Sequence, residues 1–131
     1  MSAMTVIDQP LTIAEVADLV GVSTHTLRYY EREGLLLQPV GRASSTHRRY
    51  TDADVGWLQF LTKLRLTAMP IARIKEYAEL VRRGEDTEQA RLELLLHHRA
   101  TVLAQLDEMT KSLAAIDFKI ATYQERKEDT R

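Results

Sequence analysis

The stretch that decides the fold is Ser23-Thr-His-Thr-Leu-Arg-Tyr-Tyr-Glu-Arg-Glu-Gly34, together with the basic run His47-Arg48-Arg49-Tyr50. Leu27 and Tyr30 lie three residues apart, a spacing that places both side chains on one face of a helix. Charged and hydroxyl side chains occupy the opposite face, and the terminal glycine can end the helix. The pattern predicts a short amphipathic helix, and the basic run predicts a β-hairpin after it.

The residues before this stretch predict a second short helix joined to the first by a tight turn. Thr12-Ile-Ala-Glu15 has the form of a capping box, in which two side chains satisfy backbone donors at a helix start. Gly21 can end this helix in the left-handed conformation, and Ser23 can cap the next one. Apolar residues repeat between them at three- and four-residue steps: Ile13, Val16, Ala17 and Val20. Together the two helices form a predicted helix-turn-helix over residues 12–34.

The helix that begins after Ser23 carries, on its exposed face, the side chains suited to nucleic acid. Hydroxyls and long cations near a helix N-terminus suit phosphates and base edges. The candidate DNA contacts in this helix are Thr24, His25, Thr26, Arg28, Tyr29 and Arg32. The alternative is an ordinary amphipathic helix with a solvated charged face.

The segment 35–50 favours the DNA interpretation. Pro39 and Gly41 are turn formers, and the small residues after Arg42 allow a hairpin tip. Arginines on such a hairpin can neutralise phosphates. The candidate contacts here are Arg42, His47, Arg48, Arg49 and Tyr50. A plain surface loop is the alternative.

The order of these motifs resembles that of the MerR family of winged helix-turn-helix regulators. The likeness rests on Leu27-Arg-Tyr-Tyr-Glu-Arg-Glu-Gly-Leu35 and Arg48-Arg-Tyr-Thr-Asp52, and it continues through Leu64-Arg65, Met69-Pro70 and Ile74, where the family has its second wing. It runs from about Leu11 to about Tyr123. One departure is Ala68, where the family usually has glycine. We expect the backbone at Ala68 to avoid positive φ, because alanine is strained there.

Two further helices are expected over residues 51–67 and 70–83. Thr51-Asp-Ala-Asp54 is another capping-box form, and Val55, Leu58, Leu61 and Leu64 then share one face. Trp57 and Phe60 are expected to fill the core. Lys63 and Arg65 are candidate contacts to DNA phosphates, with a solvated surface role as the alternative for Lys63.

The C-terminal third predicts a long coiled-coil helix. Its seam positions alternate in steps of three and four: Leu92, Leu95, Arg99, Val102, Leu106, Met109, Leu113, Ile116, Ile120 and Tyr123. A domain this small cannot cover so long an apolar stripe, so a homodimer is expected. The family resemblance implies that the two helices are antiparallel.

Two polar features of this helix have alternative interpretations. Arg99 either extends its charge into solvent or meets Asp117 of an antiparallel partner. His97 and His98 are neighbours and so do not face one another, which argues against a metal site. No residue pattern identifies an effector. Tyr77, Tyr123 or Met109 could line a pocket between the coiled coil and the DNA-binding domain, although a core or seam role is favoured for each.

Composition limits the class of protein. The chain of 131 residues has no cysteine, which excludes disulfides and thiolate metal sites. Its net charge is only −1, but the region from Arg28 to Arg65 holds more basic than acidic residues. No apolar run is long enough to span a membrane, and no secretion signal is present. We therefore expect a cytoplasmic, nucleoid-associated protein without membrane contact.

The sequence thus predicts a mainly α-helical protein with three parts. Residues 1–84 are expected to form a winged helix-turn-helix domain with a small β-hairpin wing, residues 85–124 a dimerisation helix, and residues 125–131 a tail. The expected function is transcription regulation on a pseudo-palindromic promoter, with double-stranded DNA, a second copy and RNA polymerase as partners. The resemblance implies action by bending and undertwisting the DNA.

A simple repressor or architectural protein is the alternative within DNA binding, and a coiled-coil adaptor is the alternative outside it. No cofactor and no metal is expected. An enzyme is not expected either, because no nucleophile–base pair, glycine-rich phosphate loop or paired acidic site is present.

Overall fold

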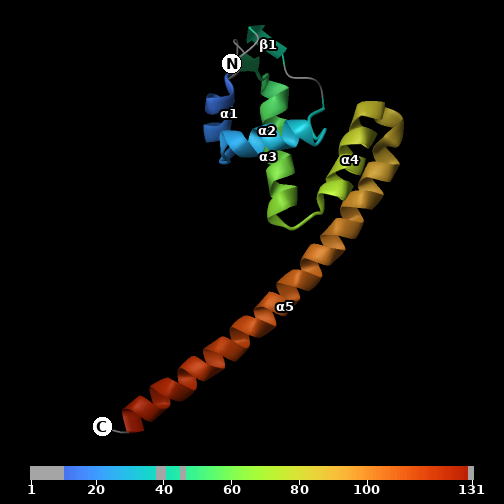
Figure 1. The fold of residues 1–131 in the computed structure, drawn as a ribbon. Helices are drawn as coiled ribbons and strands as arrows, with labels where there is room; N and C mark the ends of the chain where they lie inside the picture. The colour runs from blue at the N-terminus through green and yellow to red at the C-terminus, as the bar shows by residue number, and fades with distance from the viewer. Residues whose placement is uncertain (1–10, 38–40, 45–46, 130–131) are drawn as a thin grey trace, which may run out of the picture. The chain divides into compact units, whose positions relative to one another are not determined.

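The computed structural model describes residues 11–37, 41–44 and 47–129, and it divides after Leu92 into two compact units. Helices α1 to α4 and both strands belong to the first unit. Most of α5 forms the second unit. Figure 1 shows the order of these elements along the chain.

Helices α1 (Ile13–Val20) and α2 (Thr24–Arg32) confirm the predicted helix-turn-helix. In the capping box at α1, the Thr12 N–H donates to the Glu15 carboxylate at 2.8 Å and the Glu15 N–H donates to the Thr12 hydroxyl at 3.3 Å. Gly21 ends α1 with φ of 85°, a conformation that glycine adopts without strain. The Ser23 hydroxyl then accepts from the Thr26 N–H at 3.0 Å and so caps α2.

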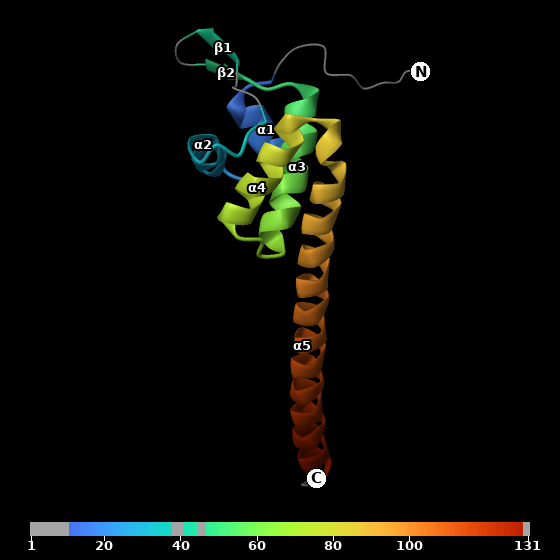
Figure 2. The ribbon, with the colours of Figure 1, turned by 90° about the vertical axis from the view of Figure 1, so that its right-hand side faces the viewer.

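The predicted hairpin consists of strands β1 (Gly41–Ser44) and β2 (His47–Arg49), which pair antiparallel. Gly41 lies opposite Arg49, Arg42 lies opposite Arg48, and the register shifts before Ser44. Figure 2 shows the two strands side by side. An isolated bridge follows the hairpin: Leu11 and Tyr50 each donate their N–H to the other's carbonyl at 2.8 Å. The base of the hairpin is therefore fastened to the segment that enters α1.

Helices α3 (Asp52–Leu66) and α4 (Ile71–Arg83) complete the core of the first unit. The predicted capping box at α3 is present, with the Thr51 N–H donating to Asp54 at 2.8 Å. α1 packs against α2, α3 and β2, and α4 packs against α3. The buried side chains include those predicted for α3, as well as Ile74 and Ala78 of α4: Val16, Ala17, Leu27, Tyr30, Leu35, Leu36, Tyr50, Val55, Leu58, Leu61, Leu64, Met69, Ile74 and Ala78.

The prediction that Trp57 and Phe60 fill the core is wrong for Phe60 and only partly right for Trp57. Phe60 is 38% exposed, and Trp57 is half-buried. Both rings pack on Tyr77 of α4, with Trp57 stacked at a centroid distance of 5.7 Å and Phe60 tilted at 5.8 Å. They form an aromatic cluster at the edge of the core, because the helix face that carries Leu58 and Leu61 takes the interior.

The expectation for Ala68 is also wrong, because its φ is 70°. The chain makes a Schellman turn at the end of α3: the Met69 N–H donates to the Leu64 carbonyl and the Ala68 N–H donates to the Arg65 carbonyl, both at 2.9 Å. Met69 is buried directly after this turn. These two hydrogen bonds and the burial of Met69 offset the steric strain of alanine, which is about 1–2 kcal/mol.

This strain predicts that Ala68→Gly stabilises the protein. Relief of the left-handed strain outweighs the extra freedom that glycine gives the unfolded chain, so the free energy of unfolding should rise by about 0.5–1 kcal/mol. Urea denaturation measures the change. The matched control is Ala72→Gly within α4, which should lower the same quantity because glycine weakens a helix. A loss of stability in Ala68→Gly would contradict the prediction.

The last helix, α5 (Glu88–Asp129), is 42 residues long and follows a single 3-10 turn, Glu85–Thr87. The Thr87 hydroxyl donates to the Leu80 carbonyl at 2.6 Å and accepts from Arg91 Nε at 3.1 Å. These bonds join the end of α4 to the first turn of α5. At about 1.5 Å per residue, α5 is roughly 60 Å long.

Candidate nucleic-acid interface

Helix α2 presents the predicted contact residues on the side opposite its buried anchors. Leu27 and Tyr30 are buried, whereas His25, Arg28 and Arg32 are exposed. Burial raises the pKa of the Tyr30 phenol, and the positive charge of Arg65 lowers it in part. The phenol therefore stays neutral at pH 7 and remains in the core. This division of the helix leaves two arginines available on one solvent-facing surface.

The hydroxyl and aromatic residues of α2 are less accessible than its cations. Thr24, Thr26 and Tyr29 are each half-buried. The Thr26 hydroxyl also accepts from the Ser23 hydroxyl at 3.0 Å, so it takes part in the helix cap. Tyr29 packs at a tilt on Tyr30, with a centroid distance of 6.1 Å. Arg28 and Arg32 are consequently the strongest candidates for base and phosphate contacts on this helix.

The hairpin positions Arg42, His47, Arg48 and Arg49 on paired strands, but their side chains lie outside what the structure describes. Tyr50 differs from its predicted role as a DNA contact, because its side chain is 0% exposed. Its backbone pairs with Leu11, and its ring fills the core beneath the hairpin. Tyr50 therefore supports the hairpin from within.

Lys63 and Arg65 lie near the end of α3, and both are exposed. Arg65 also has a structural partner, since its Nη1 donates to the Met69 carbonyl at 2.9 Å. This bond closes the turn that contains Ala68 and leaves further N–H groups of the guanidinium for other acceptors. Lys63 remains a candidate phosphate contact.

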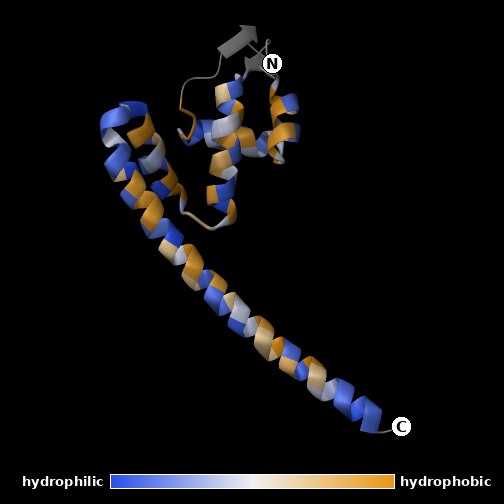
Figure 3. Cartoon of the chain, turned by 180° about the vertical axis from the view of Figure 1, so that it is seen from behind, coloured by the Kyte–Doolittle hydropathy of each residue, from blue (hydrophilic) through white to orange (hydrophobic). Residues whose placement is uncertain are grey.

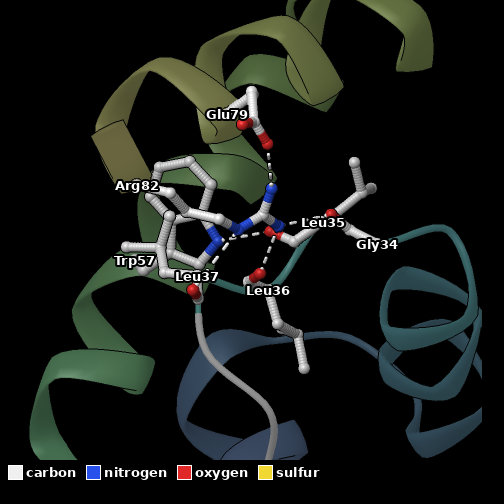
Figure 4. A network of polar contacts seen from close by, with 7 residues as sticks. All are labelled: Gly34, Leu35, Leu36, Leu37, Trp57, Glu79 and Arg82. Carbon is white, nitrogen blue, oxygen red and sulfur yellow. Dashed lines mark hydrogen bonds and ion pairs between the residues drawn. The ribbon is translucent and has the colours of Figure 1, made fainter. Parts of the chain in front are cut away.

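A group of contacts around the segment after α2 was not predicted from the sequence. Arg82 of α4 donates to three backbone carbonyls: Gly34 at 2.6 Å, Leu37 at 3.3 Å, and Leu36 at a shorter distance. It also pairs with Glu79 at 3.2 Å. Figure 4 shows this guanidinium among the carbonyls.

Two further contacts fasten the same region. The Trp57 indole N–H donates to the Leu35 carbonyl at 2.8 Å. Lys75 of α4 pairs at 3.0 Å with Glu33, the C-cap residue of α2. No spacing rule in the sequence indicates these contacts, because the partners are far apart along the chain. The only available signal was the presence of arginine, lysine and tryptophan on helices otherwise expected to pack the core.

The seam residues of α5 carry large apolar surfaces. In the single chain Leu106 is 57% exposed and Met109 is 69% exposed, and Leu113, Ile116, Ile120 and Tyr123 are similarly exposed. Figure 3 shows apolar positions recurring along α5 between hydrophilic ones. Arg99 and Asp117 are also exposed. An apolar stripe of this length on a single helix is typical of a surface that binds another helix.

Among the residues that the structure describes, no three His, Asp or Glu side chains are grouped so as to hold a metal ion. Within the same residues, no helix combines the length and apolar character needed to cross a membrane.

The fold and this surface define a helix-turn-helix DNA-binding regulator with a paired-strand wing. Comparison with known proteins gives the family: residues 11–80 match the model of the MerR HTH family regulatory proteins. An HTH-type transcriptional regulator of Haemophilus influenzae is 40% identical over 116 residues, which cover 88% of this chain and 85% of the relative. The chain belongs to the MerR family.

Solved structures agree with this assignment. HiNmlR, a MerR family regulator lacking the sensor domain and bound to promoter DNA, matches with a TM-score of 0.79 and 39% identity over 90% of this chain and 93% of that one. A MerR family regulator from Listeria monocytogenes matches with a TM-score of 0.80 and 38% identity, covering 87% of this chain and 86% of that one. The mainly α-helical fold with a helix-turn-helix expected from the sequence is thus confirmed by fold and by family.

The positions of Arg28 and of the hairpin predict different effects on DNA binding. Arg28→Ala should weaken binding to the cognate duplex far more than to a random duplex, because a bidentate base contact discriminates by about 1–3 kcal/mol. Arg42→Ala, Arg48→Ala or Arg49→Ala should weaken both duplexes similarly and reduce the salt dependence of binding. Titrations of each variant with both duplexes at several salt concentrations measure this. Equal losses for Arg28→Ala on the two duplexes would make it a backbone contact.

Proposed function

We propose that this protein binds a pseudo-palindromic promoter site as a homodimer and regulates transcription by bending and undertwisting the DNA between its half-sites. Residues 1–84 serve as the DNA-binding domain, residues 85–124 as the dimerisation helix, and residues 125–131 as a tail. The protein acts in the cytoplasm, at the nucleoid. The observation that carries the proposal is the exposed cationic face of α2, held by two buried anchors and followed by paired strands rich in arginine.

The homodimer accounts for the apolar stripe of α5. Full burial of one large apolar side chain contributes about 1.5–3 kcal/mol, and the stripe holds many such side chains. A second copy of the same helix offers the matching surface, because a two-fold interface pairs a patch with itself. In an antiparallel pair centred near Leu106 to Met109, Arg99 lies close to Asp117 of the partner helix. This pairing would give the one polar seam residue an ionic partner.

Two DNA-binding domains related by a two-fold axis explain the expected form of the site. Each α2 enters a major groove, and the two half-sites are spaced by whole turns of the duplex. The base pairs between the half-sites are then selected by their deformability, because the protein reads them through twist and bend energy. Realignment of promoter elements across an overlong spacer is the consequence, with RNA polymerase as the partner that uses the realigned promoter.

The dimer proposal predicts that charges in the seam dissociate the protein. Leu106→Asp with Leu113→Asp places carboxylates against apolar partners, at a cost of several kcal/mol, so the dimer should separate and tight operator binding should be lost. Light scattering gives the mass, and a DNA titration gives the affinity. Ala104→Asp with Ala114→Asp, on the opposite face by heptad spacing, is the matched control. A dimer with unchanged DNA affinity in the seam variant would refute the seam assignment.

The distortion proposal predicts a dependence on spacer length. The protein should activate a promoter with an overlong spacer and lose this effect when the spacer is shortened by a base pair or two at unchanged half-sites. In vitro transcription across a series of spacers measures activation, and DNA bending is followed in parallel. Undistorted DNA with repression at every spacer length would leave a simple repressor. Absence of sequence-selective, salt-dependent binding would leave a coiled-coil adaptor.

A further inference from the structure

Four successive backbone carbonyls after α2 are all held by side chains from other helices. Arg82 of α4 donates to the carbonyls of Gly34, Leu36 and Leu37, and Trp57 of α3 donates to the carbonyl of Leu35. We call Arg82, Trp57 and these four carbonyls the carbonyl clamp. Figure 4 shows both side chains directed at the segment 34–37.

The clamp holds the part of the chain that leads from the recognition helix to the hairpin. Gly34 follows the C-cap of α2 with φ of 74°, and its N–H donates to the Glu31 carbonyl at 3.1 Å. Strand β1 begins at Gly41, four residues after Leu37. The direction in which the chain leaves α2 is therefore set by contacts with α3 and α4, in addition to the turn itself.

Arg82 is suited to this role by its geometry. Its planar guanidinium offers five N–H donors in a fixed fork, which allows one side chain to bind several carbonyls at once. Glu79, one turn earlier on α4, partly neutralises its charge at 3.2 Å. The side chain is 32% exposed, and the carbonyls and Glu79 occupy much of its donor capacity. Its guanidinium is therefore engaged with the protein's own backbone, in the segment directly after α2.

We propose that Arg82 is a positioning residue: through the clamp it holds the hairpin where the hairpin arginines meet DNA phosphates, and it does so without contacting DNA. This inference rests on the proposed function. Without the clamp, the segment 34–37 that leads into the hairpin must be ordered at the moment of binding, and the ordering of backbone opposes association. Arg82 thereby contributes to DNA affinity from a helix outside the helix-turn-helix.

The first test compares variants of Arg82 in the full-length protein. The probes are a duplex selected by the wild-type protein from a random pool and an unselected duplex of equal length. Arg82→Ala and Arg82→Gln should lower affinity for both duplexes about tenfold, the effect of having to order roughly one backbone residue on binding. The salt dependence should fall, as it does when phosphate contacts are lost. Arg82→Lys keeps the charge but not the fork, so it should recover only part of the loss.

The matched control is Arg83→Ala, which removes the same charge from the neighbouring exposed position on α4. Its affinity should stay close to that of the wild-type protein. Trp57 is the single tryptophan of the chain, so its fluorescence reports folding and the environment of the clamp in every variant. Arg82→Gln provides the folded variant if Arg82→Ala proves too unstable at the binding temperature.

A double-mutant cycle separates positioning from a general effect on stability. Arg82→Gln combined with Arg48→Ala should lose less than the sum of the single losses, because both act through the hairpin. Arg82→Gln combined with Arg28→Ala should be additive. Additivity in both cycles, or wild-type affinity in Arg82→Gln, would overturn the positioning role while leaving the proposed function intact. Failure of the wild-type protein itself to bind any duplex would overturn the proposed function, and the inference with it.

Discussion

The candidate DNA-binding surface depends on the burial of Leu27 and Tyr30 beneath α2. A helix of nine residues is too short to be stable alone in water, so its structure must come from packing. Only these two side chains of α2 are buried, and the remaining residues of the helix are half-buried or exposed. The orientation of Arg28 and Arg32 follows from this, because rotation of the helix about its axis would expose the two anchors. The Ser23 cap and the Lys75–Glu33 ion pair then fix the two ends of the same helix.

Local signals made most of the fold predictable. The two capping boxes, the glycine that ends α1 and the heptad pattern of α5 each involve residues within a few positions of one another, where the sequence alone determines the geometry. The failures arose where distant or competing interactions decide the outcome. Ala68 adopts positive φ because a Schellman turn and the buried Met69 outweigh its strain. Tyr50 was grouped with the basic run beside it, but its pairing with Leu11, from the other end of the domain, directs it into the core.

The sequence predicted the candidate contact residues on α2, but it did not predict the side chains that hold the segment after α2. The exposed face of α2 follows from the spacing of its apolar residues, and the family motif adds the hairpin. No spacing pattern identifies Arg82 and Trp57, because their acceptors are backbone carbonyls of another segment. Every residue has a backbone carbonyl, so the sequence does not show which carbonyls will act as acceptors. Supports of this kind stabilise a site through groups that every residue carries. They become visible only when the fold brings the two segments together.

The bridge between Leu11 and Tyr50 also has a consequence for the order of folding. It closes a loop of about 40 residues, and closing a loop of that length opposes folding until the packed interior compensates. The helices within the loop are made of local contacts, which form faster than such distant pairings. The hairpin should therefore join a helical nucleus late, and it should be among the first elements to separate on heating. A newly synthesised chain would therefore form its helical core before the hairpin is in place, and its full affinity for DNA would develop last.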